Sequence, residues 1–535
     1  MPSATYLILN PDLPTFGEFH DDTLYFVGAK SLAAGDGYRI ASLPGQPPQT
    51  KYPPLYPLVL SAAWRFGPAF PANLQMAGWI SWLAMPALFL LMPSLFARWG
   101  LSGRRMWLLL IVFALNPYVI WLSTELLTEL PFLALALAAM ILIERSREHE
   151  APVAVALAAG IVAGLAYLTR SAGLALLPAG FLYLLLRGKG FRGRKKAIGF
   201  AAAMLPLMAA WIVWQQMHLT PTSDPSLTYY TDYAGYQRMN VSLQDFPLYL
   251  WRNLDGFLLG LGSLVIPKIV SSLLLKILAQ SIAVAMISGV VRMVRQGRAE
   301  LYAMFAAAST VLLLIWHYPP DERFVMPLWP LAFAGLLTEL EHVTAMLRAA
   351  RQHKDRSQRV AALGVMAGVV VIFGGALAYQ IVVDVSFLPE DAASHRAQRV
   401  EQVKAFDWIH ANVPGDAAFY AHLDPLLYLY TGHAATSRPL LPRYWYHEDH
   451  KAIVDYWGNV AEFARTHKLD YYYAPDVDLT HGLVEEDHQG IVKALEASPS
   501  LEKVYRAGEV TIYHFRDASR AGATGHHTEV PPQAQ

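Results

Sequence analysis

Long apolar segments recur through the middle of the chain. Because a hydrocarbon core of ~30 Å needs about 20 residues of helix, these segments predict a mainly α-helical, multi-spanning membrane domain over residues 1–383. A further apolar stretch at 55–66 is too short to cross and is predicted to lie along the interface or to form a half-helix. The ten predicted spans are 72–96, 105–122, 129–144, 152–168, 171–187, 197–217, 273–294, 301–316, 324–343 and 359–383.

Basic residues predict how the spans are oriented, since Lys and Arg in short loops are held on the cytoplasmic side. Cations gather in alternate connections, which are therefore predicted to be cytoplasmic. The opposite connections, a first loop at about 15–70 and the segment after 384 are predicted to face outward. The basic connections hold Arg98, Arg104, Arg105, Arg145, Arg147, Arg187 to Lys196, Arg292, Arg295, Arg298 and Arg348 to Arg359.

The chain after the last span is predicted to form a small extracytoplasmic α/β domain at 384–516. Apolar residues recur at helical spacing from Val400 to Ile409, and strands are predicted at 417–421 and 470–474. Two further strands, 501–507 and 510–515, flank Gly508-Glu509 and predict a β-hairpin. Residues 517–535 are predicted to be a disordered tail.

Composition supports the membrane class and excludes others. Of 535 residues, 54% are hydrophobic and 16% charged, and the mean hydropathy is +0.29. There are no cysteines, which excludes disulfides, thiolate catalysis and cysteine metal ligands. The formal net charge is zero, so nothing indicates a nucleic-acid partner.

Polar groups gather at the outer boundary rather than inside the spans. Asp21 and Asp22 begin a polar stretch that continues through Gly35-Asp36-Gly37-Tyr38 to Lys51-Tyr52-Pro53-Pro54-Leu55. Few charged residues occupy the middle of the spans, where transporters and proton pumps usually carry them. The chemistry is therefore predicted at the outer face.

These residues resemble a known family. Asp21-Asp22-Thr23-Leu24-Tyr25 is similar to the Asp-Glu-x-x-Tyr signature of GT-C glycosyltransferases that use polyprenyl-phosphate sugars, most of all to the bacterial relatives of protein O-mannosyltransferases and aminoarabinose transferases. The segments 35–38 and 51–57 resemble the glycine-tyrosine and Lys-Pro-Pro-Leu elements of that family. Further agreement lies at Ser123 to Phe132, Gly164 to Gly173 and Pro320 to Pro330.

The resemblance implies a GT-C-like helical bundle in the bacterial inner membrane that moves a sugar, with inversion, to a lipid, glycan or protein acceptor on the outer face. It implies that Asp21 is the general base and that Asp22 orients it or the acceptor. Lys51 would bind the donor phosphate. Arg323 and Arg170 are further phosphate-binding candidates by charge and side alone. No cofactor and no metal are assigned.

Each site residue also has a simpler interpretation. Asp22 could be a helix N-cap, and Lys51 could extend from a re-entrant segment to the headgroups. Arg170 and Arg323 could be interfacial anchors, or could pair with Glu322 or Glu129.

Two other clusters have structural alternatives. Glu125 and Glu129, one helical turn apart, could form a second acidic site with Asp21 or start a helix. His447-Glu448-Asp449-His450 lacks further ligands at a recognised spacing, so no metal is assigned to it. The tyrosines at 229, 230, 233 and 236, with Trp251, are interpreted as interfacial aromatics.

Two departures from the family pattern leave other functions open. Residues 1–20 are too short and proline-broken to supply the family's first transmembrane helix, so that helix is lost or lies upstream. Leu24 stands where the aminoarabinose-transferring relatives carry arginine, which argues against their substrate. A transporter or flippase for a lipid-linked saccharide, and a non-catalytic scaffold of the same fold, remain as alternatives.

Overall fold

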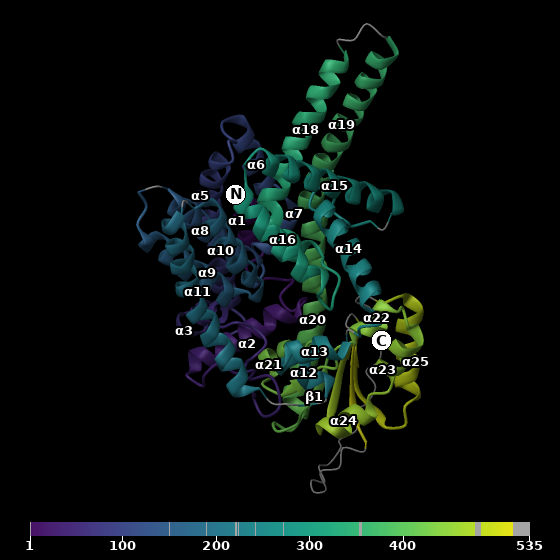
Figure 1. The fold of residues 1–535 in the computed structure, drawn as a ribbon. Coiled ribbons are helices and arrows are strands. Elements are labelled where there is room, and N and C mark those ends of the chain that lie inside the picture. The colour runs from purple at the N-terminus through teal and green to yellow at the C-terminus, as the bar shows by residue number, and fades with distance from the viewer. Residues whose placement is uncertain are drawn as a thin grey trace. The chain divides into compact units, whose positions relative to one another are not determined.

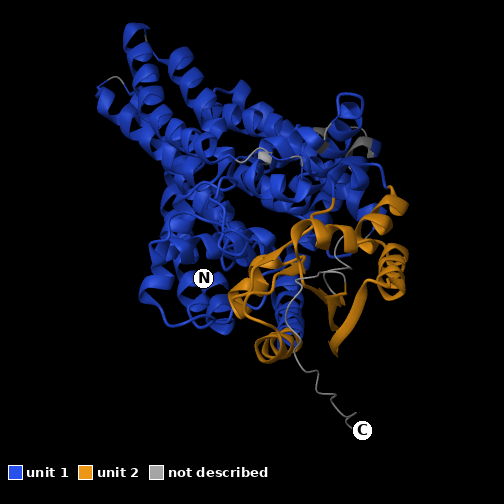
Figure 2. Cartoon of the chain, turned by 90° about the horizontal axis from the view of Figure 1, so that it is seen from below, with its two compact units in different colours: residues 1–400, 441–448 blue, residues 401–440, 449–535 orange. Residues whose placement is uncertain are grey.

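The computed structural model describes residues 2–516, except 149, 189, 220, 221, 223, 241, 271, 352–355 and 477–482. The predicted tail at 517–535 lies outside these residues. The described chain divides into two compact units (Figure 2). Unit 1 contains residues 1–400 and 441–448, and unit 2 contains residues 401–440 and the chain from Asp449 onward.

Unit 1 is helical throughout (Figure 1). Its elements are α1 (Pro2–Leu9), α2 (His20–Ala34), α3 (Leu55–Phe66), α4 (Leu74–Trp82), α5 (Ala84–Arg98), α6 (Arg104–Ala114), α7 (Pro117–Leu122), α8 (Glu129–Arg147), α9 (Val153–Thr169), η1 (Ser171–Ala175), α10 (Leu176–Arg187), α11 (Gly190–His218), α12 (Pro225–Thr231), α13 (Tyr233–Asn240), α14 (Phe246–Ser263), α15 (Leu273–Arg295), α16 (Glu300–Leu314), α17 (Glu322–Val325), η2 (Met326–Leu328), α18 (Trp329–Arg351), α19 (Arg356–Val382), the π-helical turn η3 (Val383–Phe387), the first half of α20 (Leu388–Asn412), and α22 (Pro442–Tyr446).

Five described segments are long and apolar enough to cross a membrane: Leu74–Arg98, Gly190–His218, Leu273–Arg295, Glu322–Ala349 and Val360–Asn412. Three shorter apolar helices, Val153–Thr169, Ser171–Arg187 and Glu300–Leu314, accompany them. Together they coincide with the predicted spans except those at 105–122 and 129–144. The second of these exceptions is one helix, α8, with a glutamate at its first residue and arginines in its last turn.

The predicted span at 105–122 is wrong as a single helix. Asn116 adopts an extended conformation between α6 and α7, and its side chain accepts a hydrogen bond from the Val119 amide at 3.4 Å. Pro117 follows it, and a residue that precedes proline avoids the helical region. The same asparagine donates to the Leu264 carbonyl at 2.7 Å, so a tertiary contact fixes the break.

The predicted outer loop at 15–70 contains two helices, α2 and α3, and its position relative to the membrane stays a prediction. Asp21 and Asp22 lie in the first turn of α2, where acidic side chains suit the helix dipole. Gly35 ends α2 at φ 85°, a left-handed conformation that glycine adopts readily. The short apolar stretch forms α3 with its expected bounds, Leu55–Phe66.

Glycines allow two of the membrane helices to meet closely. A Cβ placed on Gly289 of α15 would lie 1.9 Å from the carbonyl oxygen of Gly335 in α18. Such an approach is possible only without a side chain at this point, as is common where helices pack inside a membrane. The α15–α18 pair is therefore fixed by backbone contact.

Unit 2 is built on a five-stranded sheet of order β2-β1-β3-β5-β4. β1 is parallel to β2 and β3, whereas β5 is antiparallel to β3 and β4. Phe406 and Ile409 of α20 pack into its core with Ile512. Its elements are β1 (Phe419–Ala421), α21 (Asp424–Thr431), β2 (Ala435–Thr436), α23 (His450–Gly458), α24 (Ala461–His467), β3 (Tyr471–Pro475), α25 (Glu485–Ala497), β4 (Leu501–Ala507) and β5 (Val510–Phe515), after the second half of α20.

The sequence predicted most of this sheet. The hairpin of β4 and β5 has its expected bounds, and β1 and β3 lie within two residues of the predicted strands. β2 was not predicted, because two residues are too few to carry a periodic signal. The helix that contains Val400 to Ile409 begins earlier than expected and follows α19 through the π-helical turn without interruption.

Candidate active site

Asp21 lies at the start of α2 and faces two partners from distant parts of the chain. Its Oδ2 is 3.2 Å from Nη2 of Arg323, and its Oδ1 accepts a hydrogen bond from the Tyr52 hydroxyl. The side chain keeps 29% of its surface exposed. Asp21 is therefore both held in place and accessible to a ligand.

Arg323 belongs to a buried chain of alternating charges. Glu129, the first residue of α8, is completely buried, and its Oε1 lies 3.0 Å from Nε of Arg323 and 3.0 Å from Nη1 of Arg170. Arg170 ends α9 and also donates to the Thr128 hydroxyl at 2.9 Å. This series of ion pairs, Arg170–Glu129–Arg323–Asp21, links the C-terminal end of α9 to α8, α17 and α2.

The backbone around Arg323 is fixed by a helix cap. Oδ1 of Asp321 accepts hydrogen bonds from the amides of Arg323 and Phe324, at 2.9 and 3.3 Å. This cap begins the one-turn helix α17. The Arg323 guanidinium also lies 4.2 Å from the ring centroid of Phe19, which precedes α2.

Lys51 is close to the same site. It is 4% exposed, and its Nζ lies 3.3 Å from the ring centroid of Tyr229 and 4.9 Å from that of Tyr52. These are cation–π distances. The alternative in which Lys51 extends to the lipid headgroups is wrong, because its ammonium lies among aromatic side chains.

Asp22 is buried beside Asp21 but has different partners. Its Oδ2 accepts from the Gly17 amide at 2.8 Å and its Oδ1 from the Thr23 amide. It is not the N-cap of α2, since that position is Phe19. Asp22 connects the preceding segment to the first turn of α2.

The two neighbouring carboxyl groups have opposite pKa shifts. Burial tends to raise the pKa of Asp21, but Arg323, Lys51 and the Tyr52 hydroxyl outweigh it and lower the pKa to about 2. Burial raises the pKa of Asp22 to about 8, against the two amide hydrogen bonds. At neutral pH, Asp21 is therefore ionised and Asp22 retains its proton.

Aromatic residues of α12 and α13 form a wall of this site. The hydroxyls of Tyr229 and Tyr230 contact the His20 ring nitrogens at 3.3 and 3.2 Å. Tyr230 and Tyr236 are fully buried, whereas Trp251 is 65% exposed. The interpretation of these residues as interfacial aromatics stays a prediction.

The ring of His317 lies beside Tyr236 at a centroid distance of 5.5 Å. Burial and the charge of Lys51 lower the pKa of this histidine to about 3. His317 is therefore neutral at physiological pH and adds no charge to the site.

Glu125 and Glu129 do not share a helix face. Glu125 lies in the turn before α8, where it accepts a hydrogen bond from the Thr15 hydroxyl. Glu129 pairs with two arginines through Oε1, and its assignment as a possible second acidic site stays a prediction. Glu322, the other expected partner of the arginines, instead lies 3.0 Å from Lys268.

The sequence predicted that Asp21, Lys51, Arg170 and Arg323 lie on the same side of the membrane. The structure brings these four residues together with Glu129. Tyr52 and His20 were not predicted as site residues. Tyr52 separates Lys51 from the two prolines, where the Lys-Pro-Pro-Leu element has no residue, and this insertion beside a charged residue was the only sequence signal for it.

The histidine cluster of the sequence is divided between ion pairs. His447 lies 3.4 Å from Asp245, and His450 lies 2.8 Å from Asp487. Within the described ranges, no group of three or more metal-ligating side chains occurs.

The fold has solved counterparts. ArnT from Cupriavidus metallidurans, bound to undecaprenyl phosphate, aligns at 12% identity with a TM-score of 0.50, over 97% of this chain and 99% of that one. The oligosaccharyltransferase AglB from Archaeoglobus fulgidus, in complex with an inhibitory peptide and a dolichol-phosphate, aligns at 12% identity with a TM-score of 0.50. This alignment covers 93% of this chain and 71% of AglB.

The chain has the fold of the GT-C glycosyltransferases. No protein-family model matches it, and no curated protein matches its sequence. The GT-C fold and the apolar helices together make the chain an integral membrane protein. In this GT-C fold the Asp21 site is formed at the ends of helices rather than midway along them.

We expect Glu129→Gln to destabilise the protein severely. Removing one member of a buried ion pair leaves its partners without compensation and costs roughly 3–5 kcal/mol, and here two arginines lose their carboxylate. Thermal unfolding in detergent measures the effect. Glu148→Gln, just beyond the other end of α8 and 65% exposed, is the matched control and should change stability by less than about 0.5 kcal/mol. Equal unfolding midpoints for the two variants would contradict the account.

Proposed function

We propose that the chain is a membrane glycosyltransferase that moves a sugar from a polyprenyl-phosphate donor to an acceptor on the outer face of the membrane. The observation that carries this proposal is an ionised, accessible Asp21 held beside Arg323 and near Lys51. The GT-C fold supports it, since both solved counterparts hold a polyprenyl-type lipid phosphate.

Asp21 is suited to the role of general base. As an acceptor hydroxyl attacks the anomeric carbon, its proton passes to the Asp21 carboxylate and the bond from that carbon to the phosphate oxygen breaks. The electron pair of that bond leaves with the lipid phosphate. Attack from the side opposite the phosphate inverts the anomeric configuration. Tyr52, which donates to Oδ1 of Asp21, would keep the carboxylate oriented during this step.

The charges of the site fit a phosphodiester. Three cations, Arg170, Arg323 and Lys51, face two carboxylates, Asp21 and Glu129, because Asp22 is protonated at neutral pH. One net positive charge remains, and a lipid-phosphate sugar carries one negative charge. As the lipid phosphate departs it gains a second negative charge, which nearby cations stabilise.

The same cations must serve both Asp21 and the donor. Arg323 and Lys51 lower the pKa of Asp21 to about 2, which makes the free carboxylate a weak base. A donor phosphate that binds them neutralises part of their field. The pKa of Asp21 would then rise toward the range in which a carboxylate accepts a proton effectively. Donor binding would in this way activate the base.

We expect Asp21→Asn to abolish sugar transfer while the protein still accumulates, because asparagine cannot accept the proton. The measurement is transfer from a panel of radiolabelled polyprenyl-phosphate sugars in membranes. Loss of a general base costs roughly 10²–10⁴-fold. Asp36→Asn, the same substitution at an exposed residue just beyond α2, should leave transfer unchanged.

Two outcomes of this experiment would contradict the proposal. Full transfer by Asp21→Asn would remove Asp21 from the chemistry. Binding or translocation of the donor without any product, equal in both proteins, would indicate a carrier of lipid-linked saccharides.

The pH dependence should differ between the free and the donor-bound enzyme. A base loses activity as the pH falls through its pKa, and kcat/KM follows the free enzyme whereas kcat follows the bound complex. With the pKa of free Asp21 at about 2, kcat/KM should show no acid limb from this residue above roughly pH 3. The acid limb of kcat should lie at higher pH. Coincident acid limbs would contradict activation by donor binding.

A further inference from the structure

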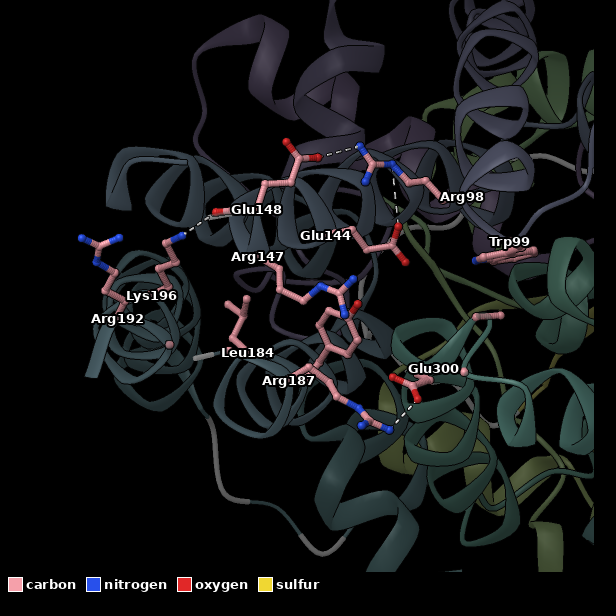
Figure 3. A pocket seen from close by; sticks show the side chains of 15 residues that line it. Arg98, Trp99, Glu144, Arg147, Glu148, Leu184, Arg187, Arg192, Lys196 and Glu300 are labelled. Carbon is pink, nitrogen blue, oxygen red and sulfur yellow. Dashed lines mark hydrogen bonds and ion pairs between the residues drawn. The ribbon is translucent and has the colours of Figure 1, made fainter. Parts of the chain in front are cut away.

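A second polar site lies at the other end of α8. A cavity of about 560 Å³ opens among the ends of α5, α8 and α10 and the starts of α11 and α16. Figure 3 shows the charged side chains that line it: Arg98 points toward Glu144 and Glu148 and Arg187 toward Glu300, whereas Arg192 points away from Arg147. The proposed transfer reaction uses none of them.

The cavity is rich in cations, several of which are engaged. Its lining includes five basic and three acidic residues. Arg98 lies 3.7 Å from Glu144 and 3.6 Å from Glu148, and Arg187 lies 2.5 Å from Glu300. The Lys196 ammonium donates to the Glu148 carbonyl at 3.1 Å. The basic residues are Arg98, Arg147, Arg187, Arg192 and Lys196.

Two arginines that line the cavity form no ion pair with a described carboxylate. Within the described part of the chain, neither Arg147 nor Arg192 has a carboxylate within 4.0 Å. The Arg147 guanidinium lies 5.7 Å from the ring centroid of Tyr183, another lining residue. The five basic residues outnumber the three glutamates by two, so the cavity carries two net positive charges.

The backbones at the end of α10 and the start of α11 lie in close contact at two glycines. A Cβ on Gly188 would lie 2.5 Å from the Cα of Gly193, so neither position tolerates a side chain without a shift. Arg187 and Arg192 flank this contact and both line the cavity. The glycines therefore bring the backbones of α10 and α11 together, although the side chains of Arg187 and Arg192 point apart in Figure 3.

The cavity and the Asp21 site lie at opposite ends of α8. Glu129 of the Asp21 site and Arg147 of the cavity are the first and last residues of α8, which separates them by ~27 Å at 1.5 Å per residue. This is close to the thickness of the hydrocarbon core. Two exposed apolar residues near the cavity, Leu186 (65%) and Phe191 (71%), offer a surface for acyl chains.

We propose that this cavity binds the phosphate headgroup of an anionic lipid, in the leaflet opposite the Asp21 site. Phosphate oxygens accept charge-assisted hydrogen bonds from guanidinium groups. Arg147 and Arg192 both line the cavity, and each can contribute positive charge to it without giving up a carboxylate partner. Lipid tails would lie along the apolar surface of α10 and the start of α11. Basic pockets between membrane helices on the cytoplasmic side suit such headgroups.

The test uses the full chain purified in detergent and native mass spectrometry to measure bound lipid. Dioleoylphosphatidylglycerol should bind, and dioleoylphosphatidylcholine should not. The double variant Arg147→Gln/Arg192→Gln should weaken phosphatidylglycerol binding roughly 30-fold, since each cation near a lipid surface contributes about a factor of five. Both arginines are exposed, so the unfolding midpoint without lipid should match that of the unmodified protein.

The control removes two other arginines that are also predicted to be cytoplasmic but do not line the cavity. Arg104→Gln/Arg145→Gln should retain binding within about twofold. Competition by glycerol 1-phosphate would show that the cavity recognises a phosphate ester without acyl chains, and no competition would assign it to lipid. Equal loss of binding in both double variants, or equal binding of the two phospholipids, would overturn the proposal.

Discussion

The structure of the Asp21 site depends on the buried carboxylate of Glu129. Two arginines from distant parts of the chain lie 3.0 Å from it, and a buried ion cluster is stable only when every charge is matched. Glu129 can hold the two arginines together because α8 places it, with no exposed surface, at a helix start. Glu129 orients the Arg323 side chain, whose backbone the Asp321 cap holds, and Arg323 in turn contacts Asp21.

The two carboxylates of the site have different environments: Glu129 is buried between arginines, whereas Asp21 is partly exposed. Glu129 neutralises Arg170 and shares Arg323, whereas Asp21 shares Arg323 and keeps 29% of its surface exposed. Lys51, placed over the Tyr229 ring, adds positive charge without a second buried carboxylate. A phosphate that enters the site therefore competes with the accessible acid, Asp21, and not with the buried one. In the proposed function, this competition links donor binding to the basicity of the catalytic group.

The sequence predicted the elements better than their contacts. Apolar runs and strand patterns are local, so they located most spans and the β4–β5 hairpin, and failed at Asn116, where a tertiary hydrogen bond and the following proline break the helix. Asp21, Lys51 and Arg323 could be proposed as site residues from their predicted side of the membrane and from the family resemblance. Pairing of the arginines with Glu129, 194 positions from Arg323, was one of two alternatives suggested by charge alone. The Tyr52–Asp21 hydrogen bond, between residues 31 positions apart, has no signal in the periodicity of a single sequence.

In the proposed function, the cations beside Asp21 bind the donor's phosphate. The most direct measurement is the affinity of the purified chain for undecaprenyl phosphate, compared between Lys51→Met and Lys30→Met. Lys30 lies on α2 with its ammonium 5.5 Å from the Trp64 ring centroid, so its removal tests a neighbouring charge. The account predicts at least about tenfold weaker binding for Lys51→Met, since a hydrogen bond to a charged group contributes roughly 1.5–3 kcal/mol, and unchanged binding for Lys30→Met. Equal affinities in the two variants would contradict it.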